Sequence, residues 1–390
     1  MFVRYLNMGL PLRQSAFLWG ARQSGKSSFL KTTYPESVYY DLLDTQQQMR
    51  LTRSPHLLRT EILALPQAAL QQPIIIDEFQ KVPALLDEIH WLIENTQAYF
   101  ILCGSSARKL KMCSPNLLGG RAWLYHFFPL VSCEIPDFDL LRALQHGLLP
   151  KHYLASTDAL VRHLEAYVAV YLSEEIRKEG LVRNLANFSK FLEVAGLCNG
   201  EMLNFNNIAR DCGIDRSTVK GYFQILEDTF MGSFISPFAK KVKRELIISA
   251  PKFYFFDVGV ANYLGGRAVV SLKGAAAGKS FEHFMWMELM AYCGLSQKRE
   301  KITYWRTKQG AEVDFIVGDA KLAIELKISE QVHASELKGL ISFCEEHPET
   351  IPMVVSQDAR QRLLVINEQC KIRIYPWREF LAELWAGMLF

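Results

Sequence analysis

Three short apolar runs in the first third of the chain predict buried strands. They are SAFLW at 15–19, PIII at 73–76 and YFILC at 99–103. The β-branched run at 74–76 is typical of a central parallel strand, because a strand covered on both faces loses its polar alternation. The first run continues through a glycine-rich turn into SFLKTTY, which predicts a helix. This strand and helix order indicates an α/β domain.

The middle of the chain has helical periodicity. Between 161 and 179 the apolar residues recur at helical spacing, and we expect 137–200 to form a mostly helical lid. From 203 to 230 two short helices are predicted around Gly213, with Asp215 capping the second. This is helix-turn-helix patterning. The stretches 233–238 and 247–256 are predicted wing strands.

The last third alternates again between strands and helices. A helix is predicted near Ser280, after a Gly/Ala-rich connection at 274–278. Strands are then expected at 302–307, 311–317, 321–327, 352–356 and 363–366, with helices at 336–346 and 377–389. This order predicts a second α/β unit.

Composition changes this picture little. The 390 residues are 49% hydrophobic and 22% charged, which suits two or three globular domains. A net charge of +3 does not mark the whole chain as a nucleic-acid binder, so a basic surface would be local. The eight cysteines form no CxxC pair and are expected to be reduced thiols. Without a signal-like or membrane-length apolar segment, a cytoplasmic protein with no membrane contact is expected.

The strongest chemical signal is the turn after the first strand, which has the pattern GxxxxGK[ST] between a strand and a helix. Glycines let successive backbone N–H groups point at a phosphate. Lys26 is expected to reach the β- and γ-phosphates of ATP, and the Ser27 hydroxyl to ligate Mg²⁺. The residues predicted to contact the nucleotide are Gly20, Ala21, Arg22, Gln23, Ser24, Gly25, Lys26, Ser27 and Ser28.

An acidic pair ends the second strand, where ligands bind in open α/β sheets. Asp77 is expected to hold the magnesium through water, and Glu78 to polarise the attacking water as general base. Ser105 follows the third strand and either senses the γ-phosphate or belongs to a plain Gly-Ser turn. Arg121, after two glycines, either reaches a phosphate in this or a neighbouring subunit or is a surface arginine.

The segments GARQSGKSS, IIIDEFQKVP, FILCGSS and LLGGRAWLYHFFPL, in this order, resemble AAA-type (AAA_14) P-loop ATPases that carry a DUF4143 C-terminal region. The resemblance covers nearly the whole chain. It implies ATP binding, a sensor role for Ser105 and a functional role for Arg121. It says little about biological role.

The predicted helix-turn-helix suggests a DNA contact. Arg216, Ser217, Lys220 and Gln224 would face a groove. The basic wing would meet phosphates through Lys240, Lys241, Lys243 and Arg244. The alternative is a lid that contacts protein, with the basic stretch as a solvated turn.

The predicted hairpin near Gly318 brings charged residues together. A two-residue loop pairs either 317 with 320 or 318 with 321. In both registers Asp314, Glu325 and Lys327 share one face, because side chains alternate with period two. Two carboxylates suit a hard divalent cation and the lysine suits a phosphodiester. Glu282 could complete the cluster.

This order resembles the PD-(D/E)xK nuclease pattern, with matching positions at Glu282, Asp314, Glu325 and Lys327. The proline that often precedes the Asp is replaced by Val313. The resemblance implies metal ligation by the three carboxylates and catalysis by Lys327. The alternatives are a solvated face with a cross-strand ion pair and a nuclease-like fold that binds without cutting.

We therefore expect an α/β protein with three domains: a P-loop AAA-type ATPase core (1–135), a helical and winged-helix lid (136–250) and a restriction-endonuclease-like domain (251–390). The predicted function is ATP hydrolysis with Mg²⁺, coupled to DNA binding, with Mg²⁺-dependent DNA cleavage as a further candidate activity of the tail. The alternative is a nucleotide-gated protein-interaction module with an inactive tail. A homo-oligomer is compatible with Arg121 acting in trans.

Overall fold

The computed structural model describes residues 2–106, 117–171, 176, 182, 184–238, 250–298, 300–368 and 370–390. The chain divides into two compact units, Met1–Leu130 with Ile225–Met231, and Val131–Gln224 with Gly232–Phe390. The two later domains expected from the sequence both lie in the second unit. Within the described ranges, no helix combines the length and apolarity that crossing a bilayer requires.

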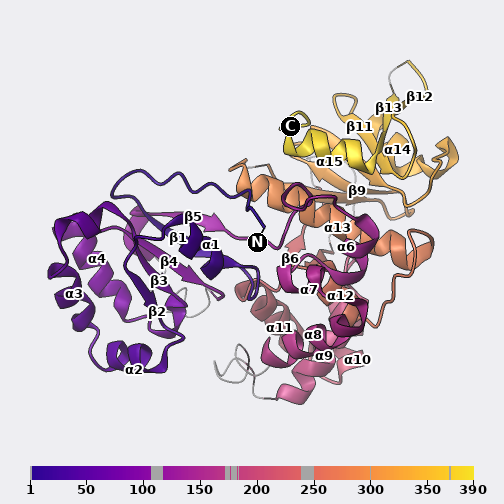
Figure 1. Ribbon diagram of the computed structural model, residues 1–390. Helices are drawn as coiled ribbons and strands as arrows, with labels where there is room; N and C mark the ends of the chain where they lie inside the picture. Colours follow the sequence, from indigo (N-terminus) through magenta and orange to yellow (C-terminus); the bar gives the residue numbers. More distant parts are fainter. Residues whose placement is uncertain are drawn as a thin grey trace. The chain divides into compact units, whose positions relative to one another are not determined.

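The first unit is built on a five-stranded parallel sheet with the order β2-β3-β4-β1-β5. Helices α3 and α4 pack side by side next to it (Figure 1). The elements are β1 (Ser15–Trp19), α1 (Lys26–Thr33), β2 (Tyr39–Asp41), α2 (Thr45–Arg53), α3 (His56–Leu63), β3 (Ile74–Asp77), α4 (Leu85–Asn95), β4 (Phe100–Gly104) and β5 (Ala122–His126).

The three predicted strands of this unit are confirmed as β1, β3 and β4, each fully buried. Strands β2 and β5 were not predicted. β2 has only three residues, and β5 is largely exposed, so neither has a long apolar run. Because β4 lies between β1 and β3 and all run parallel, the segments that follow these three strands meet at one edge of the sheet.

The second unit begins with helices. They include α6 (Leu140–His146), α7 (Pro150–Leu154), α8 (Thr157–Val170), α9 (Leu185–Leu197), α10 (Phe205–Cys212), α11 (Arg216–Asp228) and α12 (Val258–Leu264). The end of α11, from Ile225 on, belongs to the first unit. The predicted helix-turn-helix corresponds to α10 and α11. Gly213 takes a left-handed φ of 71° in the turn, and Asp215 Oδ1 accepts the Thr218 N–H at 2.9 Å as the predicted cap. Strands β6 (Gly232–Ile235) and β7 (Lys252–Phe255) then form an antiparallel pair.

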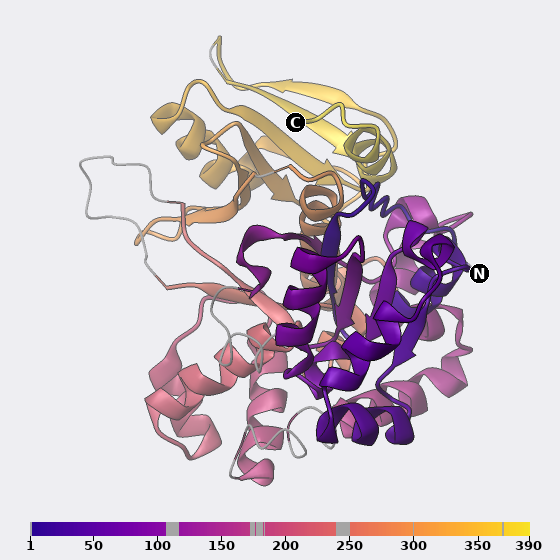
Figure 2. The ribbon, with the colours of Figure 1, turned by 90° about the vertical axis from the view of Figure 1, so that its left-hand side faces the viewer.

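The rest of this unit is a mixed six-stranded sheet of order β12-β13-β11-β10-β9-β8. Helices α14 and α15 lie on opposite sides of it (Figures 1 and 2). Its elements are α13 (Gly274–Leu295), β8 (Ile302–Arg306), β9 (Glu312–Val317), β10 (Leu322–Leu326), α14 (Lys338–Glu346), β11 (Ile351–Ser356), β12 (Arg362–Val365), β13 (Lys371–Pro376) and α15 (Trp377–Trp385).

Two expectations for this region were wrong. The Gly/Ala-rich stretch 274–278 is the start of α13, where three alanines are strong helix formers and Ala277 packs into the core. A helix beginning near Ser280 would place Glu282 close to its start, whereas Glu282 lies in the third turn of α13. Strand β13 was also missed, although its first four residues, Lys371 to Ile374, alternate between exposed and buried positions.

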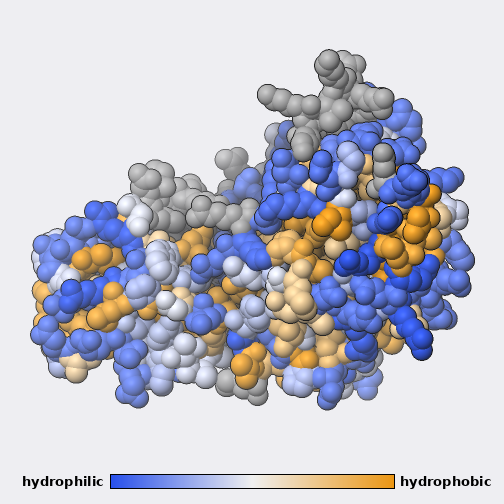
Figure 3. All heavy atoms as spheres, turned by 90° about the horizontal axis from the view of Figure 1, so that it is seen from above, coloured by the Kyte–Doolittle hydropathy of each residue, from blue (hydrophilic) through white to orange (hydrophobic). Residues whose placement is uncertain are grey.

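Hydrophilic and hydrophobic side chains are interspersed on the face drawn in Figure 3. The hydrophobic cores lie in the interior of each unit. In the first unit, the strands bury residues such as Phe17, Ile76 and Leu102 against helical residues such as Leu58 and Ile89. This packing holds the sheet edge that carries the candidate site.

Candidate nucleotide site and a buried carboxylate cluster

Two glycines determine the shape of the loop between β1 and α1. Gly20 lies close to the backbone of Phe127, and Gly25 takes a left-handed conformation. A Cβ at Gly20 would lie 2.2 Å from the Phe127 carbonyl oxygen, so only glycine fits there. Gly25 has φ 103°, which places it just before α1 in a conformation that side chains rarely adopt. The loop therefore ends at the N-terminus of α1, where backbone N–H groups are available to an anion.

The Lys26 side chain is directed back into this loop. It is buried, and its Nζ donates to the carbonyl oxygens of Gly20 at 2.8 Å and Ala21 at 2.9 Å. Arg4, which the sequence did not single out, donates to the Ser24 carbonyl at 2.8 Å and helps to hold the loop from outside. Because an ammonium has three donors, Lys26 can keep one loop contact and still bind a phosphate.

The two predicted magnesium ligands are joined by a tyrosine from β2. The Tyr39 hydroxyl donates to Asp77 Oδ2 at 2.5 Å. Burial first, and then the Asp77 carboxylate, raise the pKa of Tyr39 well above its ordinary value, while a hydrogen bond with Ser27 acts in the opposite direction. Tyr39 therefore touches both Ser27 and Asp77, and these two oxygen donors suit a hard cation such as Mg²⁺.

Glu78 is buried and has a second set of partners. Its Oε2 accepts from Gln80 Nε2 at 2.6 Å and from the Ser105 hydroxyl at 3.2 Å. Gln80 Nε2 also lies 3.2 Å from Ser105 Oγ. Glu78 has a left-handed φ of 53°, which costs a non-glycine residue roughly 1–2 kcal/mol. The structure thus brings together Glu78 and Ser105, as the parallel strand order requires.

The other amide atom of Gln80 is less favourably placed. Its Oε1 is buried and has no hydrogen-bond partner. A buried acceptor without a partner costs about 1–3 kcal/mol. Strain and an unsatisfied atom thus occur together beside the proposed base, and such features are concentrated at functional sites.

Arg121 lies at the opposite end of the sheet, where the parallel strands begin. It directly precedes β5, whose first residue Ala122 pairs with Ser15 at the start of β1, and Gln14 Nε2 donates to the Arg121 carbonyl at 3.1 Å. Its guanidinium forms an ion pair with Glu94, and its side chain is 40% exposed. A five-residue strand spans about 16 Å, so Arg121 does not reach the phosphate site of its own chain.

Sequence reasoning missed Tyr39 and Gln80. Tyr39 lies 38 residues before Asp77 in a three-residue strand, so no local pattern marks it. Gln80 lies only two residues after Glu78, and its position within the DEFQ stretch was the available signal.

A partly buried cluster of charged residues occupies the second unit. Strands β9 and β10 pair Val317 with Leu322 and Phe315 with Ile324. This is the second of the two predicted registers, and continuing it places Asp314 opposite Glu325. Lys327 Nζ lies 2.7 Å from Glu325 Oε1, so the predicted grouping is confirmed for these three residues.

Glu282 is bound differently from the expectation. Lys252 of β7 has a buried ammonium that lies 3.4 Å from Glu282 Oε1 and 2.7 Å from Glu312 Oε1. The Tyr254 hydroxyl also donates to Glu282. In the part of the chain that the structure describes, no three or more His, Cys, Asp or Glu side chains are arranged to hold a metal. Among these described residues the predicted three-carboxylate metal site is therefore not assembled, and Glu282 contacts Lys252 and Tyr254 instead.

Asp314 and Glu325 nevertheless retain features of a cation site. Burial first, and then Glu325 and Glu282, raise the pKa of Asp314 well above its usual range. Burial also raises the pKa of Glu325, although Lys327 opposes this, and Glu325 Oε2 is buried without a hydrogen-bond partner. The donor chemistry of this pair fits a hard divalent ion.

The raised pKa values have a consequence for stability. A carboxyl whose folded pKa exceeds its unfolded value stabilises the fold fully below the unfolded pKa, and this contribution is lost as pH rises through the folded pKa. For Asp314 and Glu325 the unfolded values are about 4. The pair therefore destabilises the second unit progressively above that pH.

The residues predicted to face DNA on α11 are exposed where they are described. Arg216, Ser217, Lys220 and Gln224 all have exposed side chains, and Lys220 Nζ lies 5.6 Å from the centre of the Phe205 ring. Lys240, Lys241, Lys243 and Arg244 lie outside the described residues.

Comparison with known families agrees with this organisation. Residues 13–135 match the AAA domain family AAA_14, residues 137–271 match a domain of unknown function, DUF8612, and residues 277–378 match another, DUF4143. The second match extends past residue 250, where the sequence predicted a boundary. The resemblance to AAA-type proteins with a DUF4143 region is thus confirmed for these two domain families.

Similar whole proteins add little about function. Two uncharacterized proteins, from Mycobacterium bovis and Mycobacterium tuberculosis, are each 25% identical over 309 residues, which is 77% of this chain and 66% of theirs. The chain therefore spans just under two thirds of the length of these relatives.

Two solved structures align at low similarity. The Walker-type ATPase PABY2304 of Pyrococcus abyssi has a TM-score of 0.42 at 15% identity, covering 64% of this chain and 91% of that one. The Aeropyrum pernix ORC1 protein in complex with DNA has a TM-score of 0.28 at 12% identity, covering 66% and 87%. By its family match and parallel sheet, the first unit of this chain carries an AAA-type ATPase-like, nucleotide-binding domain.

Proposed function

We propose that this protein binds and hydrolyses ATP and couples its nucleotide state to DNA binding. The observation that carries the proposal is the shared sheet edge. There a buried P-loop lysine follows β1, an acidic pair ends β3 and a buried serine follows β4. Families built on this arrangement use it for phosphoryl transfer by positioning and electrostatic stabilisation.

Each residue has a distinct role in this proposal. Lys26 binds the β- and γ-phosphates and neutralises charge that develops during transfer. Ser27 and Asp77 would hold Mg²⁺, which supplies charge neutralisation at the phosphates when bound. Glu78 polarises the attacking water as general base, and Ser105 senses the γ-phosphate.

Arg121 is proposed to act only in trans. Its position at the far edge of the sheet leaves it available to a neighbouring copy, and its ion pair with Glu94 would have to open. This role requires a homo-oligomer, so the rate of hydrolysis per subunit should rise with protein concentration. A rate that is independent of concentration would remove it.

For DNA, we propose that α11 contacts a groove and that the basic segment between β6 and β7 contacts phosphates. The exposed Arg216, Lys220 and Gln224 lie on one helix, whose opposite face buries Val219 and Phe223. Affinity that falls steeply with salt is expected, since phosphate contacts release counterions. Arg216→Ala combined with Lys220→Ala should weaken binding, whereas a salt-independent affinity would contradict the proposal.

We further propose Mg²⁺-dependent DNA cleavage by Asp314, Glu325 and Lys327 of the tail. The partnerless Oε2 of Glu325 and the raised pKa of Asp314 support a cation between these carboxylates. The lysine at 327 would orient water and offset charge on the phosphate.

A second candidate function is a nucleotide-gated interaction module with an inactive tail. The buried Lys252 ammonium favours it, because it supplies beside Glu282 and Glu312 the positive charge that a metal would otherwise supply. In this case the tail retains the nuclease-like arrangement but binds a partner.

One pair of assays separates these functions. The first measures ATP hydrolysis by the parent, Lys26→Ala and Glu78→Gln proteins. Lys26→Ala should lose binding, and Glu78→Gln should retain ATP but stall. Normal turnover in both would refute the ATPase proposal. The second measures Mg²⁺-dependent cleavage of single- and double-stranded DNA by the parent and Asp314→Ala, with and without ATP. Absence of cleavage in both, while ATP is turned over, would favour the interaction module.

A further inference from the structure

We propose that Gln80 is a positioning residue for Glu78. Its side-chain amide, together with the Ser105 hydroxyl, holds one oxygen of the Glu78 carboxylate so that the other faces the attacking water. The inference rests on the proposed ATP hydrolysis and adds a residue that acts through the base and does not contact the nucleotide.

The contacts form a closed triangle beside the acidic pair. Gln80 Nε2 donates to Glu78 Oε2 at 2.6 Å, Ser105 Oγ donates to the same oxygen at 3.2 Å, and Gln80 Nε2 lies 3.2 Å from Ser105 Oγ. All three side chains are buried, with exposed fractions of 8% for Glu78, 2% for Gln80 and 1% for Ser105. Both donors meet Oε2, which leaves Oε1 as the oxygen that can polarise water.

The orientation of the Gln80 amide follows from the negative charge of the Glu78 carboxylate. If the amide were rotated by half a turn, its oxygen would face the Glu78 carboxylate and two acceptors would be opposed. In the observed orientation Oε1 is pressed against Gly104, where an added Cβ would lie 2.3 Å from it and 2.5 Å from the Trp19 ring. That oxygen has no hydrogen-bond partner.

A glutamine is therefore a poor choice for this position on packing grounds alone. Methionine has a similar shape and would fill the same space against Trp19 and Gly104 without leaving a buried acceptor unsatisfied. Among the described residues, the Gln80 side chain forms its hydrogen bonds with Glu78 and Ser105. The amide is thus best explained by what it does for Glu78.

The backbone between the two residues makes the contact possible. Glu78 takes a left-handed φ of 53°, and the one-turn 3-10 helix Phe79–Lys81 follows at once. Lys81 N–H donates to the Glu78 carbonyl at 2.9 Å, which closes the turn. This tight turn brings the side chain of residue 80 back to that of residue 78, in a strained conformation of a kind that is concentrated at functional sites.

The principal test is Gln80→Met, with Gln14→Met as matched control. Gln14 lies at the opposite edge of the same sheet and donates to the carbonyls of Ser15 and Arg121. We expect kcat for ATP hydrolysis to fall about tenfold or more in Gln80→Met, because a general base acts only when oriented. We expect the KM for ATP and the Kd for a non-hydrolysable ATP analogue to change less than about twofold, since the Gln80 side chain contacts Glu78 and Ser105 and not the P-loop residues proposed to bind the phosphates. Gln14→Met should change none of them.

A double-mutant cycle tests whether Gln80 acts through Glu78. Gln80→Met should have no further effect on the residual rate of Glu78→Gln. Multiplied losses in the double variant would show that Gln80 acts elsewhere and would overturn the proposal.

Gln80→Glu provides a second variant of nearly the same shape. Its introduced carboxyl can donate to Glu78 only when protonated, so the ratio of its kcat to that of the parent should rise as pH falls from 8 toward about 5. A purely structural role predicts no such recovery.

The outcomes separate this inference from the function on which it rests. If the parent hydrolyses ATP and Gln80→Met is equally fast or faster, the positioning role is wrong while the ATPase proposal stands. If the parent and Lys26→Ala are equally inactive, both proposals fail.

Discussion

The contact of Tyr39 with Asp77 gives a quantitative prediction for Tyr39→Phe. The hydroxyl donates to Asp77 Oδ2 at 2.5 Å and also bonds with Ser27, so it lies against both proposed magnesium ligands. We expect that Mg²⁺ binding with ATP requires this contact to open. The ring itself should stay in place in the variant, because Lys31 Nζ lies 4.9 Å from its centre and retains its interaction with the aromatic face.

The magnitude follows from the hydrogen bond that is removed. A hydrogen bond to a charged group contributes about 1.5–3 kcal/mol. If Mg²⁺ binding must break the whole of it, Tyr39→Phe should lower the half-saturating Mg²⁺ concentration roughly 10- to 150-fold, at 1.4 kcal/mol per tenfold. A smaller decrease would mean that the hydroxyl is only partly displaced.

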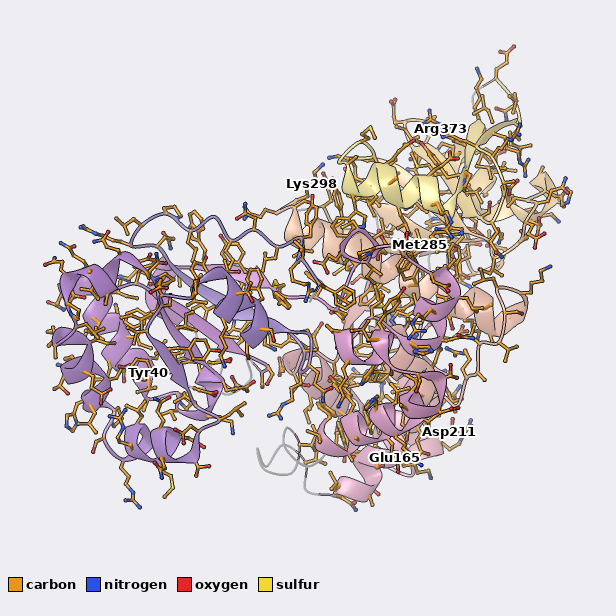
Figure 4. All side chains as sticks on the ribbon, viewed as in Figure 1. Tyr40, Glu165, Asp211, Met285, Lys298 and Arg373 are labelled. Carbon is orange, nitrogen blue, oxygen red and sulfur yellow. The ribbon has the colours of Figure 1, made fainter. Side chains whose placement is uncertain are left out.

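The assay is a Mg²⁺ titration at saturating ATP, followed both by hydrolysis and by binding of a fluorescent non-hydrolysable analogue. Tyr40→Phe is the matched control. Tyr40, which is labelled in Figure 4, is the next residue of β2, and its hydroxyl donates to Glu61 Oε2 at 3.2 Å. It should leave the Mg²⁺ midpoint unchanged.

The reasoning would be refuted by an unchanged or higher Mg²⁺ midpoint in Tyr39→Phe. A higher midpoint would mean that Tyr39 orients Asp77 for the metal and does not compete with it. An equal decrease in Tyr40→Phe would point to a general loosening of β2.

Two further predictions use matched pairs elsewhere in the chain. Gly20→Ala should lower the free energy of unfolding by about 1–3 kcal/mol, read as a lower melting temperature, and should weaken ATP binding. The reason is that its Cβ would lie 2.2 Å from a backbone oxygen. At Gly221 on α11 an added Cβ would meet nothing within 4 Å, so Gly221→Ala should instead raise the free energy of unfolding by about 0.5–1 kcal/mol. A change of the same sign in both variants would contradict the packing argument. Asp314→Asn should raise the melting temperature, with a gain over the parent that grows as pH rises above about 4, since it removes a carboxyl whose pKa is raised in the folded state. Mg²⁺ should raise the melting temperature of the parent more than that of Asp314→Asn. The control Asp319→Asn, in the exposed adjacent turn, should behave like the parent. A difference between Asp314→Asn and the parent that does not change with pH would argue against repulsion between Asp314 and Glu325.

Much of the nucleotide site could be predicted because its parts are local in sequence. The strand, turn and helix around Lys26 lie within residues 15–33, and glycine spacing alone determines where the backbone can approach a phosphate. The acidic pair was recognisable because it ends an apolar strand. The hairpin was also predicted locally, up to a choice of register that the pairing of Val317 with Leu322 decides.

Other features could not be obtained in this way. Local pattern does not give strand order or direction, which place Ser105 beside Glu78 but Arg121 at the opposite edge of the sheet. Likewise, the contacts of Tyr39 with Asp77 and of Lys252 with Glu282 join residues 38 and 30 positions apart in sequence.

The sequence by itself therefore determined the chemistry available to this protein: a P-loop, an acidic pair and a second set of carboxylates with a lysine. Only the tertiary structure decided which of these groups meet, and which additional side chains, such as Gln80 and Lys252, bind them. The physical reason is that hydrophobic periodicity and motif spacing report only on local structure, over a few residues of the chain. The partner of a buried charged group is decided instead by which helices and strands pack around it.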